Sequence, residues 1–259
     1  MGNEIIRIDG HDFELSTHEG DRGTGGPITL KKPMWMIERY RMLAKEFQGA
    51  NMVEVGLWDG GSTAFLASAF APSALLGFEL ETRPLTALDT FLENSPHAPN
   101  VHVTLGADQS DVALLRRTVE EHVDGLLDFV VDDASHLLGP TEVTFDCLFP
   151  LIRPGGVFVI EDWSHDHQMA NAIRKRLASG EMAVEDLGEI SDDSVPGDPL
   201  SRLVIDCVLA TSHNDGVIDD VWVRQGWAEI RRGATTLDPS TFSLRDHIGE
   251  IGRKVSPRP

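Results

Sequence analysis

Acidic side chains and one histidine gather where two apolar segments end, between residues 126 and 162. The second of these segments follows a Pro-Gly-Gly turn. If both segments are neighbouring strands of a parallel sheet, about 5 Å apart, their ends present these side chains at one edge. The sequence therefore predicts a site at that edge. Its residues are Asp132, Asp133, His136, Glu161 and Asp162.

Three of these acids, Asp133, Glu161 and Asp162, form an all-oxygen ligand set. Such a set suits Mg²⁺ or another divalent cation, and the absence of clustered Cys or His disfavours zinc. Without a cation the acids would repel one another. His136 titrates near neutrality, so it suits a general base that takes a proton from a hydroxyl group. Asp132 has a local alternative, in which it caps the next turn or bonds the backbone.

Other residues near these positions have two interpretations. His165 and His167 are either extra ligands or substrate contacts, or they form the polar entry to a helix. Trp58 and Trp163 pack either on a ligand or in a core or interface. The sequence leaves these alternatives open.

A glycine turn joins a strand to a helix in the sequence EVGLWDGGST at 54–63. Glycines there let the backbone approach a ligand, and the helix N-terminus presents free N–H groups. The spacing differs from the G-x-G-x-x-G of dinucleotide-binding proteins. It resembles the first motif of class I S-adenosylmethionine-dependent methyltransferases, in which the turn lies beside the amino acid part of the cofactor.

Acids at the ends of the next two strands complete a cofactor site. Glu79 fits the carboxylate that binds both ribose hydroxyls in nucleotide-binding α/β folds. Asp108 fits the acidic position near the adenine. An ordinary tight turn would explain the two glycines alone, but the three positions together favour a cofactor. The residues predicted to bind it are Glu54, Gly56, Trp58, Gly60, Gly61, Ser62, Thr63, Glu79, Asp108, Gln109 and Asp133.

Strand and helix patterns alternate with short connections from residue 51 to residue 162. This order predicts a parallel sheet with helices on both faces. β-like patterns at 200–211 and 219–232, with His-Asn-Asp-Gly between them, predict a terminal hairpin. The predicted fold is α/β, with a Rossmann-like, doubly wound, mostly parallel seven-stranded sheet and a C-terminal antiparallel hairpin, as in class I methyltransferases.

The segment 33–165 resembles the macrocin O-methyltransferase family, which includes the rhamnosyl O-methyltransferases and the proteins called cephalosporin hydroxylases. The matching motifs are D-D-x-S-H and F-x-x-L-F-P-x-x-R-P-G-G-x-x-x-I-E-D, which agree in order and spacing. One departure is Ala134, where the family often has glycine. The resemblance implies that Asp133, Glu161 and Asp162 bind Mg²⁺ and that His136 is the base. It also implies a homo-oligomer and a sugar hydroxyl on a glycosylated natural product, as in antibiotic biosynthesis.

The sequence pattern divides the chain into two predicted regions. Residues 1–33 form an N-terminal extension, with a hairpin around Asp9 and Gly10 and then a glycine-rich loop, suited to oligomer or lid contacts. Residues 34–259 form the methyltransferase domain, which begins with a helix over 34–47 that has Pro33 in its first turn. The acidic stretch 180–199 is predicted as a loop and 254–259 as a poorly ordered end.

Composition excludes several classes of partner. The formal net charge of −20 argues against nucleic acid or an anionic membrane. Two cysteines are too few for a disulfide framework or a zinc site. No apolar stretch approaches the roughly 20 residues of a membrane span, and the N-terminus has no signal pattern. We therefore expect a cytoplasmic protein with a small-molecule substrate.

Three other functions are compatible with parts of the pattern. An NAD(P)- or flavin-dependent oxidoreductase shares the fold class, but the missing G-x-G-x-x-G motif counts against it. A non-catalytic S-adenosylmethionine-binding partner protein would have no need of the acids and His136. A metal-dependent hydrolase is more distant. The expected reaction is methyl transfer to a hydroxyl whose pKa is lowered by a metal ion, with alignment of the reactants supplying much of the rate.

Overall fold

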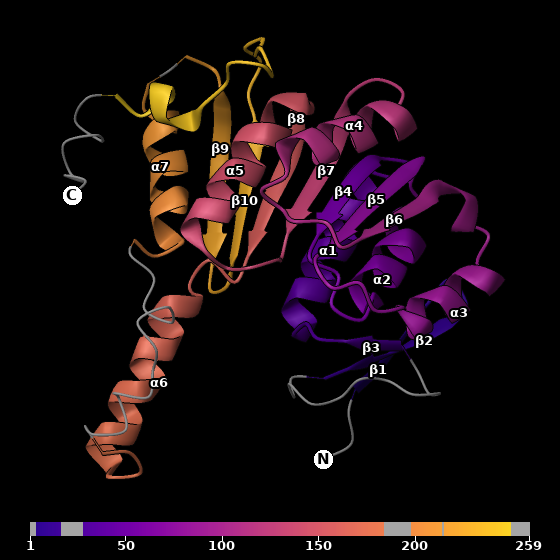
Figure 1. Ribbon diagram of the computed structural model, residues 1–259, viewed down its shortest axis with the longest axis horizontal. Helices are drawn as coiled ribbons and strands as arrows, with labels where there is room; N and C mark the ends of the chain where they lie inside the picture. The colour runs from indigo at the N-terminus through magenta and orange to yellow at the C-terminus, as the bar shows by residue number, and fades with distance from the viewer. Residues whose placement is uncertain (1–3, 17–27, 184–197, 214, 250–259) are drawn as a thin grey trace.

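A seven-stranded sheet forms the centre of the computed structural model, which describes residues 4–16, 28–183, 198–213 and 215–249 (Figure 1). Its strand order is β6-β5-β4-β7-β8-β10-β9. Its first five strands in chain order pair in parallel, and β10 pairs antiparallel with both β8 and β9. The predicted fold class is confirmed. The strands are β4 (Asn51–Val55), β5 (Ala74–Glu79), β6 (Val101–Leu105), β7 (Leu127–Asp132), β8 (Ile152–Glu161), β9 (Ile218–Arg224) and β10 (Trp227–Arg232).

Helices cover both faces of this sheet and bury two separate apolar clusters. On one face lie α1 (Met34–Glu46), α2 (Gly61–Phe70) and α3 (Thr86–Asn94). On the other lie α4 (Val112–His122), α5 (Leu138–Leu148) and α7 (Ser201–Thr211). The short 3-10 helices are η1 (Ala98–Asn100), η2 (Phe149–Leu151) and η5 (Leu244–His247). The remaining helix, α6 (His165–Ser179), buries no residue and projects from the body in Figure 1.

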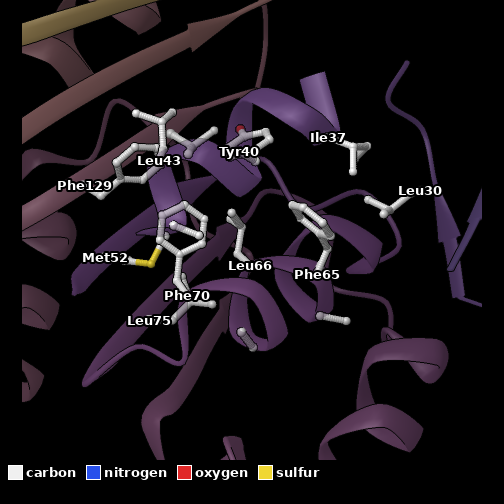
Figure 2. Close-up of a cluster of buried hydrophobic side chains, with 14 of the residues drawn as sticks. Leu30, Ile37, Tyr40, Leu43, Met52, Phe65, Leu66, Phe70, Leu75 and Phe129 are labelled. Carbon is white, nitrogen blue, oxygen red and sulfur yellow. The ribbon is translucent and has the colours of Figure 1, made fainter. Parts of the chain in front are cut away.

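The core between α1, α2 and the sheet positions one polar atom for the site (Figure 2). Ile37, Tyr40 and Leu43 lie one helical turn apart on α1, so they share its buried face. Tyr40 packs edge-on against Phe65 and Phe129 and is fully buried. A buried tyrosine hydroxyl requires a hydrogen-bond partner. It finds that partner in a carboxylate at the end of β8.

The N-terminal extension forms a small sheet of its own, in the order β1-β2-β3. The hairpin predicted around Asp9 and Gly10 is confirmed, since β1 (Glu4–Ile8) and β2 (His11–Leu15) pair antiparallel across these residues. Part of the predicted loop is instead a strand, because β3 (Ile28–Leu30) pairs in parallel with β2. A three-residue strand is too short to show an alternating pattern, so the sequence could not reveal it.

The predicted strand at 200–211 is wrong, because this segment is the helix α7. Its buried residues include Leu203, Val204, Cys207 and Ala210, which follow the three- and four-residue spacing of a helix face. Segment 200–211 is so apolar that the helical spacing of its buried residues is not evident, and its composition resembles that of a buried strand. The predicted pairing of 200–211 with 219–232 is therefore wrong as well. A C-terminal antiparallel hairpin is present, but β9 and β10 form it, and its turn contains Gly226.

Several predictions concern residues outside the described ranges, namely most of the acidic loop at 180–199, the tail at 254–259 and the glycine-rich part of 17–27. Pro33 lies one residue earlier than predicted, at the N-cap of α1. Within the described part of the chain, no helix has the length and apolar character needed to cross a membrane.

Candidate active site

A pocket lies at the carboxyl ends of β4 and β7, beside the segment that follows β3. Five of the residues predicted to bind the cofactor line it together, namely Gly56, Trp58, Gly61, Ser62 and Asp133. The other lining residues are Thr29, Lys31, Lys32, Leu57 and Asp59. The N-terminal extension therefore forms one wall of the predicted cofactor site.

Close backbone contacts explain two glycines of the turn. Gly56 has φ +86°, and a Cβ placed on it would lie 2.3 Å from the carbonyl oxygen of Asp133. A Cβ on Gly61 would lie 2.0 Å from the carbonyl oxygen of Thr29. Only glycine permits either approach. The turn is thus held between the end of β7 and the strand β3, and within it Gly60 is the left-handed N-cap of α2.

Glu54 is fully buried on β4, next to the start of α2. Its Oε2 accepts a hydrogen bond from Thr63 Oγ1 at 2.7 Å. Its Oε1 is buried without a hydrogen-bond partner in the described part of the chain. Burial raises the pKa of Glu54 to about 7. A buried acceptor that lacks a partner is suited to an N–H donor of a ligand, so Glu54 fits the amino acid part of the predicted cofactor.

Glu79, at the end of β5, holds the glycine turn in place. Its Oε2 accepts hydrogen bonds from the backbone N–H groups of Leu57 (2.9 Å) and Trp58 (2.8 Å). Its Oε1 accepts one from Glu81 (2.9 Å). Three backbone donors on one buried carboxylate fix the shape of the turn. An ionised carboxylate has about four acceptor positions, so contact with ribose hydroxyls stays a compatible prediction.

Two residues in the loop after β6 differ in their surroundings. Asp108 is exposed and accepts one backbone N–H two residues further on (2.8 Å), so its adenine role stays a prediction. Gln109 is buried, and its Nε2 donates to Asp132 Oδ2 (3.3 Å) and Thr144 Oγ1 (3.2 Å). Its Oε1 accepts from the backbone of Ser135 (3.1 Å). Gln109 therefore braces the loop after β7.

Asp132 has the local role that the sequence offered as an alternative. The residue is buried, and its Oδ1 accepts the backbone N–H of Ala134 at 3.3 Å. Burial raises the pKa of Asp132 to about 7. Its carboxyl group thus supports the backbone at the point where β7 leads into the acid cluster.

Lys32 contacts two of the predicted metal ligands. Its Nζ donates to Asp133 Oδ2 at 2.9 Å and to Glu161 Oε2 at 2.7 Å. The side chains of Lys32 and Glu161 are 5% and 4% exposed. The hydroxyl of Tyr40 donates to the other oxygen of Glu161. Both oxygens of Glu161 are therefore held by groups of this chain.

In this buried group one ammonium group, that of Lys32, pairs with two carboxylates, those of Asp133 and Glu161. Burial alone would lower the pKa of Lys32, but Asp133 and Glu161 outweigh burial and raise it. Burial raises the pKa of Glu161, and Lys32 offsets this only in part. Burial also acts on Asp133, but Lys32 and His136 outweigh it and hold the pKa of Asp133 below its ordinary value. Glu161 is thus the acid that ionises less readily.

A second, more open group contains Asp133, His136 and Asp162. Each offers one ligand atom, and these atoms lie within 4.8 Å of one another. His136 Nε2 lies 3.3 Å from Asp133 Oδ1. Burial alone would lower the pKa of His136, but the hydrogen bond to Asp133 and the nearby acids raise it. Burial, together with the charge of Asp133, raises the pKa of Asp162.

The predicted set of three metal ligands is therefore divided between two groups. Among the described residues, the converging atoms belong to Asp133 and Asp162 with His136, whereas Glu161 faces Lys32 and Tyr40. Two carboxylates and an imidazole are ligands that a divalent cation accepts. The residues present fit such an ion in chemical type, and the participation of Glu161 stays a prediction.

Residues after Asp162 divide between the site and the packing around it. The ring of His165 lies with its centroid 5.3 Å from that of His136. His167 Nε2 lies 2.8 Å from Ser201 Oγ, so it contacts α7. Trp163 donates its indole N–H to the β9–β10 hairpin at 2.9 Å. His165 therefore borders the site, whereas His167 and Trp163 have packing roles.

Sequence reasoning missed Lys32 and Tyr40. Lys32 pairs with residues 101 and 129 positions later in the chain. Nothing in the adjacent pair Lys31–Lys32 indicates which lysine is buried. Tyr40 is the single tyrosine of the chain and lies on the apolar face of α1. This position was a usable signal, because a buried hydroxyl needs an acceptor.

The strand order and the placement of the glycine turn define the class I methyltransferase fold. Residues 53–163 match the family model Methyltransf_24, which describes a methyltransferase domain. The match covers less than half of the chain, and the resemblance to the macrocin and rhamnosyl O-methyltransferases is confirmed as sequence similarity.

Two curated relatives illustrate this similarity. The 8-demethyl-8-(2-methoxy-alpha-L-rhamnosyl)-tetracenomycin-C 3'-O-methyltransferase of Streptomyces olivaceus is 37% identical over 103 residues, which is 40% of this chain and 23% of that protein. The mycinamicin VI 2''-O-methyltransferase of Micromonospora griseorubida is 28% identical over 138 residues, 49% of this chain and 31% of that protein. The matched region thus spans less than a third of either relative.

Solved structures share the fold at low sequence identity. MycE, a methyltransferase from the mycinamycin biosynthetic pathway solved with Mg and SAH, has a TM-score of 0.53 and 23% identity over 77% of this chain and 50% of its own. The O-methyltransferase TomG from Streptomyces achromogenes, solved with SAM, has a TM-score of 0.53 and 17% identity over 78% of this chain and 82% of its own.

Proposed function

We propose that this protein is an S-adenosylmethionine-dependent O-methyltransferase that acts on a sugar hydroxyl of a glycosylated natural product. The observation that carries the proposal is the pocket in which the glycine turn and Asp133 meet, with His136 against the same aspartate. The methyltransferase-domain match and the names of the similar proteins support the reaction and the substrate class.

The donor would lie in the pocket beside the glycine turn. Gly56 and Gly61 line this pocket, and Glu54 offers a buried acceptor for an amino group. Glu79 and Asp108 are the proposed partners of the ribose and the adenine. Gln109 supports this arrangement by bracing the loop after β7.

A divalent cation would be held by Asp133, Glu161 and Asp162. When bound, such an ion supplies Lewis-acid polarisation of an acceptor oxygen. Of the three, Asp133 and Asp162 already converge with His136. The recruitment of Glu161 would require its contact with Lys32 to change.

His136 is the proposed base. An ionised carboxylate only accepts hydrogen bonds, so in the neutral form of His136 the contact with Asp133 would place the hydrogen on Nε2 and the lone pair on Nδ1. Nδ1 is then the atom that takes the proton of the acceptor hydroxyl. The new O–C bond forms as the C–S bond of the methyl donor breaks, and S-adenosylhomocysteine leaves.

Calorimetric titration tests the cofactor part of this proposal. S-adenosylmethionine, S-adenosylhomocysteine and NAD are each titrated with and without Mg²⁺. We expect both methyl cofactors to bind and NAD to give no heat. Binding of NAD without either methyl cofactor would reject a methyltransferase in favour of an oxidoreductase.

A methyl-transfer assay tests the substrate class and the base. Acceptors include rhamnosylated tetracenomycin and mycinamicin VI, the compounds in the names of the similar proteins. His136→Ala should lower turnover by about 10²–10⁴-fold, as for loss of a general base, with unchanged S-adenosylhomocysteine affinity. His167→Ala is the matched control, because His167 contacts Ser201. Near-normal turnover in His136→Ala would remove His136 from the mechanism. The homo-oligomeric state stays a prediction.

A further inference from the structure

Lys32 occupies the space between two carboxylates that the proposed function assigns to a metal ion. Its Nζ lies 2.9 Å from Asp133 Oδ2 and 2.7 Å from Glu161 Oε2. The lysine side chain is almost fully buried, at 5% exposure. Buried lysines are rare unless they are paired. Here the two acids supply the pairing, so the ammonium group is the counter-charge of the cluster.

The arrangement has consequences for any second cation. A divalent ion bound by Asp133 and Glu161 would lie within a few ångströms of Lys32, where two positive charges repel strongly in a partly desolvated site. Glu161 is also held by the Tyr40 hydroxyl on its other oxygen. The carboxylate oxygens held by neither Lys32 nor Tyr40 belong to Asp162 and to Oδ1 of Asp133, which lies beside His136.

The segment that carries Lys32 is anchored beside the cofactor turn. Thr29, three residues earlier, places its carbonyl oxygen where a Cβ on Gly61 would lie. Lys31, one residue earlier, lies with Nζ 4.3 Å from the centroid of the Trp58 ring. The backbone that carries Lys32 therefore also forms a wall of the pocket.

We propose that Lys32 is a built-in cation that competes with a divalent metal ion for Asp133 and Glu161, and so sets the metal affinity of the site. The inference rests on the metal site of the proposed function. In the native protein Lys32 keeps metal binding weak, and the ion binds fully only when the lysine leaves Glu161. Lys32 thereby acts as a positioning residue through the acids and does not itself touch the acceptor.

The test measures Mn²⁺ binding directly, by the electron paramagnetic resonance signal of free Mn²⁺ during titration. Lys32→Met removes the ammonium group and keeps an apolar chain of similar length. We expect Lys32→Met to bind Mn²⁺ at least 30-fold more tightly than the native protein. Lys31→Met is the matched control, and its Mn²⁺ affinity should stay within threefold of native.

A second variant covers the case in which Lys32→Met does not fold. Lys32→Gln removes the ammonium charge and keeps a side-chain amide that can donate a hydrogen bond to Asp133 or Glu161. It should also bind Mn²⁺ more tightly than the native protein, because no ammonium group competes for these two acids. Mn²⁺ should raise the melting temperature of both variants more than that of the native protein.

The outcomes separate this inference from the proposed function. Equal Mn²⁺ affinity in the native protein and in whichever lysine variants fold would overturn the role of Lys32 and leave the metal site standing. No Mn²⁺ binding in any variant would overturn both the role of Lys32 and the metal site. Methyl transfer by the native protein without added metal would then show that the reaction itself survives.

Discussion

The two halves of the candidate site stabilise their carboxylates in different ways. At the ends of β4 and β5, Glu79 accepts three backbone hydrogen bonds from residues close to it in sequence or in the adjoining turn. At the ends of β7 and β8, Asp133 and Glu161 depend on the ammonium group of Lys32, more than 100 residues away in the chain. The first half is a product of local backbone geometry. The second depends on how the N-terminal extension folds back.

This difference has a functional meaning. Backbone donors are fixed, so the half beside the glycine turn suits a cofactor of constant shape. A lysine side chain can be replaced by another cation, so the acid cluster suits an exchangeable partner. We therefore expect substitutions in the first half to affect stability and cofactor binding together. Substitutions in the second half should affect metal binding most.

The largest expected effect comes from Glu79→Ala. The change leaves the backbone N–H groups of Leu57, Trp58 and Glu81 without their acceptor. A buried donor left unsatisfied costs about 1–3 kcal/mol, and the donor of Leu57 is buried whereas the other two are partly buried. We therefore expect a total loss of about 4 kcal/mol in the free energy of unfolding. Urea denaturation measures it. A loss below about 1 kcal/mol, the lower end for a single donor, would show that the turn does not depend on this carboxylate.

Gly61→Ala should have the next largest effect. Its Cβ would lie 2.0 Å from the carbonyl oxygen of Thr29, so β3 must move. Overpacking of this kind costs about 3 kcal/mol at its upper range, and S-adenosylhomocysteine affinity should fall with it. Gly139→Ala is the control, because a Cβ on Gly139 meets nothing within 4 Å. Equal stability of the two variants would contradict the close contact.

Glu54 should make stability fall as the pH rises. Burial raises the folded pKa to about 7 from an ordinary value of 4.5. Between these values the unfolded chain has lost the proton and the folded protein keeps it, so stability decreases with pH. The decrease should be roughly 2 kcal/mol from about pH 5 to about pH 8. Glu54→Gln should remove this component in denaturation curves across that range. The same dependence of stability on pH in the native protein and in Glu54→Gln would contradict this expectation.

The smallest expected effect is that of Asp108→Asn. Asp108 is exposed, and an asparagine oxygen can still accept the backbone hydrogen bond. Stability should change by less than about 0.5 kcal/mol. If Asp108 binds the adenine, S-adenosylhomocysteine affinity should fall about tenfold, which corresponds to about 1.4 kcal/mol. Unchanged affinity in calorimetry would remove Asp108 from the cofactor site.

Local patterns predicted much of the fold. The helix that begins at Gly61 and the strand that ends before Asp133 were both predicted, because periodicity and glycine placement act over a few residues. The strand predicted at 200–211 failed because an apolar helix and a buried strand have similar composition there. The parallel pairing of the strands followed from the alternation of elements.

The candidate site was predictable only as a set of strand ends. Asp133, His136 and Asp162 do converge, as their positions after two adjacent strands indicated. The pairing of Glu161 with Lys32 was not predictable, because no local pattern encodes a contact across 129 positions. The difference in burial between Glu161 and Asp162 arises only in the folded chain, so it cannot be read from two adjacent acids in the sequence.

The left-handed backbone at the site limits how the protein can be engineered. Trp58, His136 and Asp162 have φ of 55°, 57° and 49°. Such conformations cost of order 1 kcal/mol or more in residues other than glycine. A search for heat-stable variants that ranks substitutions by stability alone would favour glycine at all three positions. It would yield robust proteins that lack the proposed base, so directed evolution of this chain should select for turnover at every round.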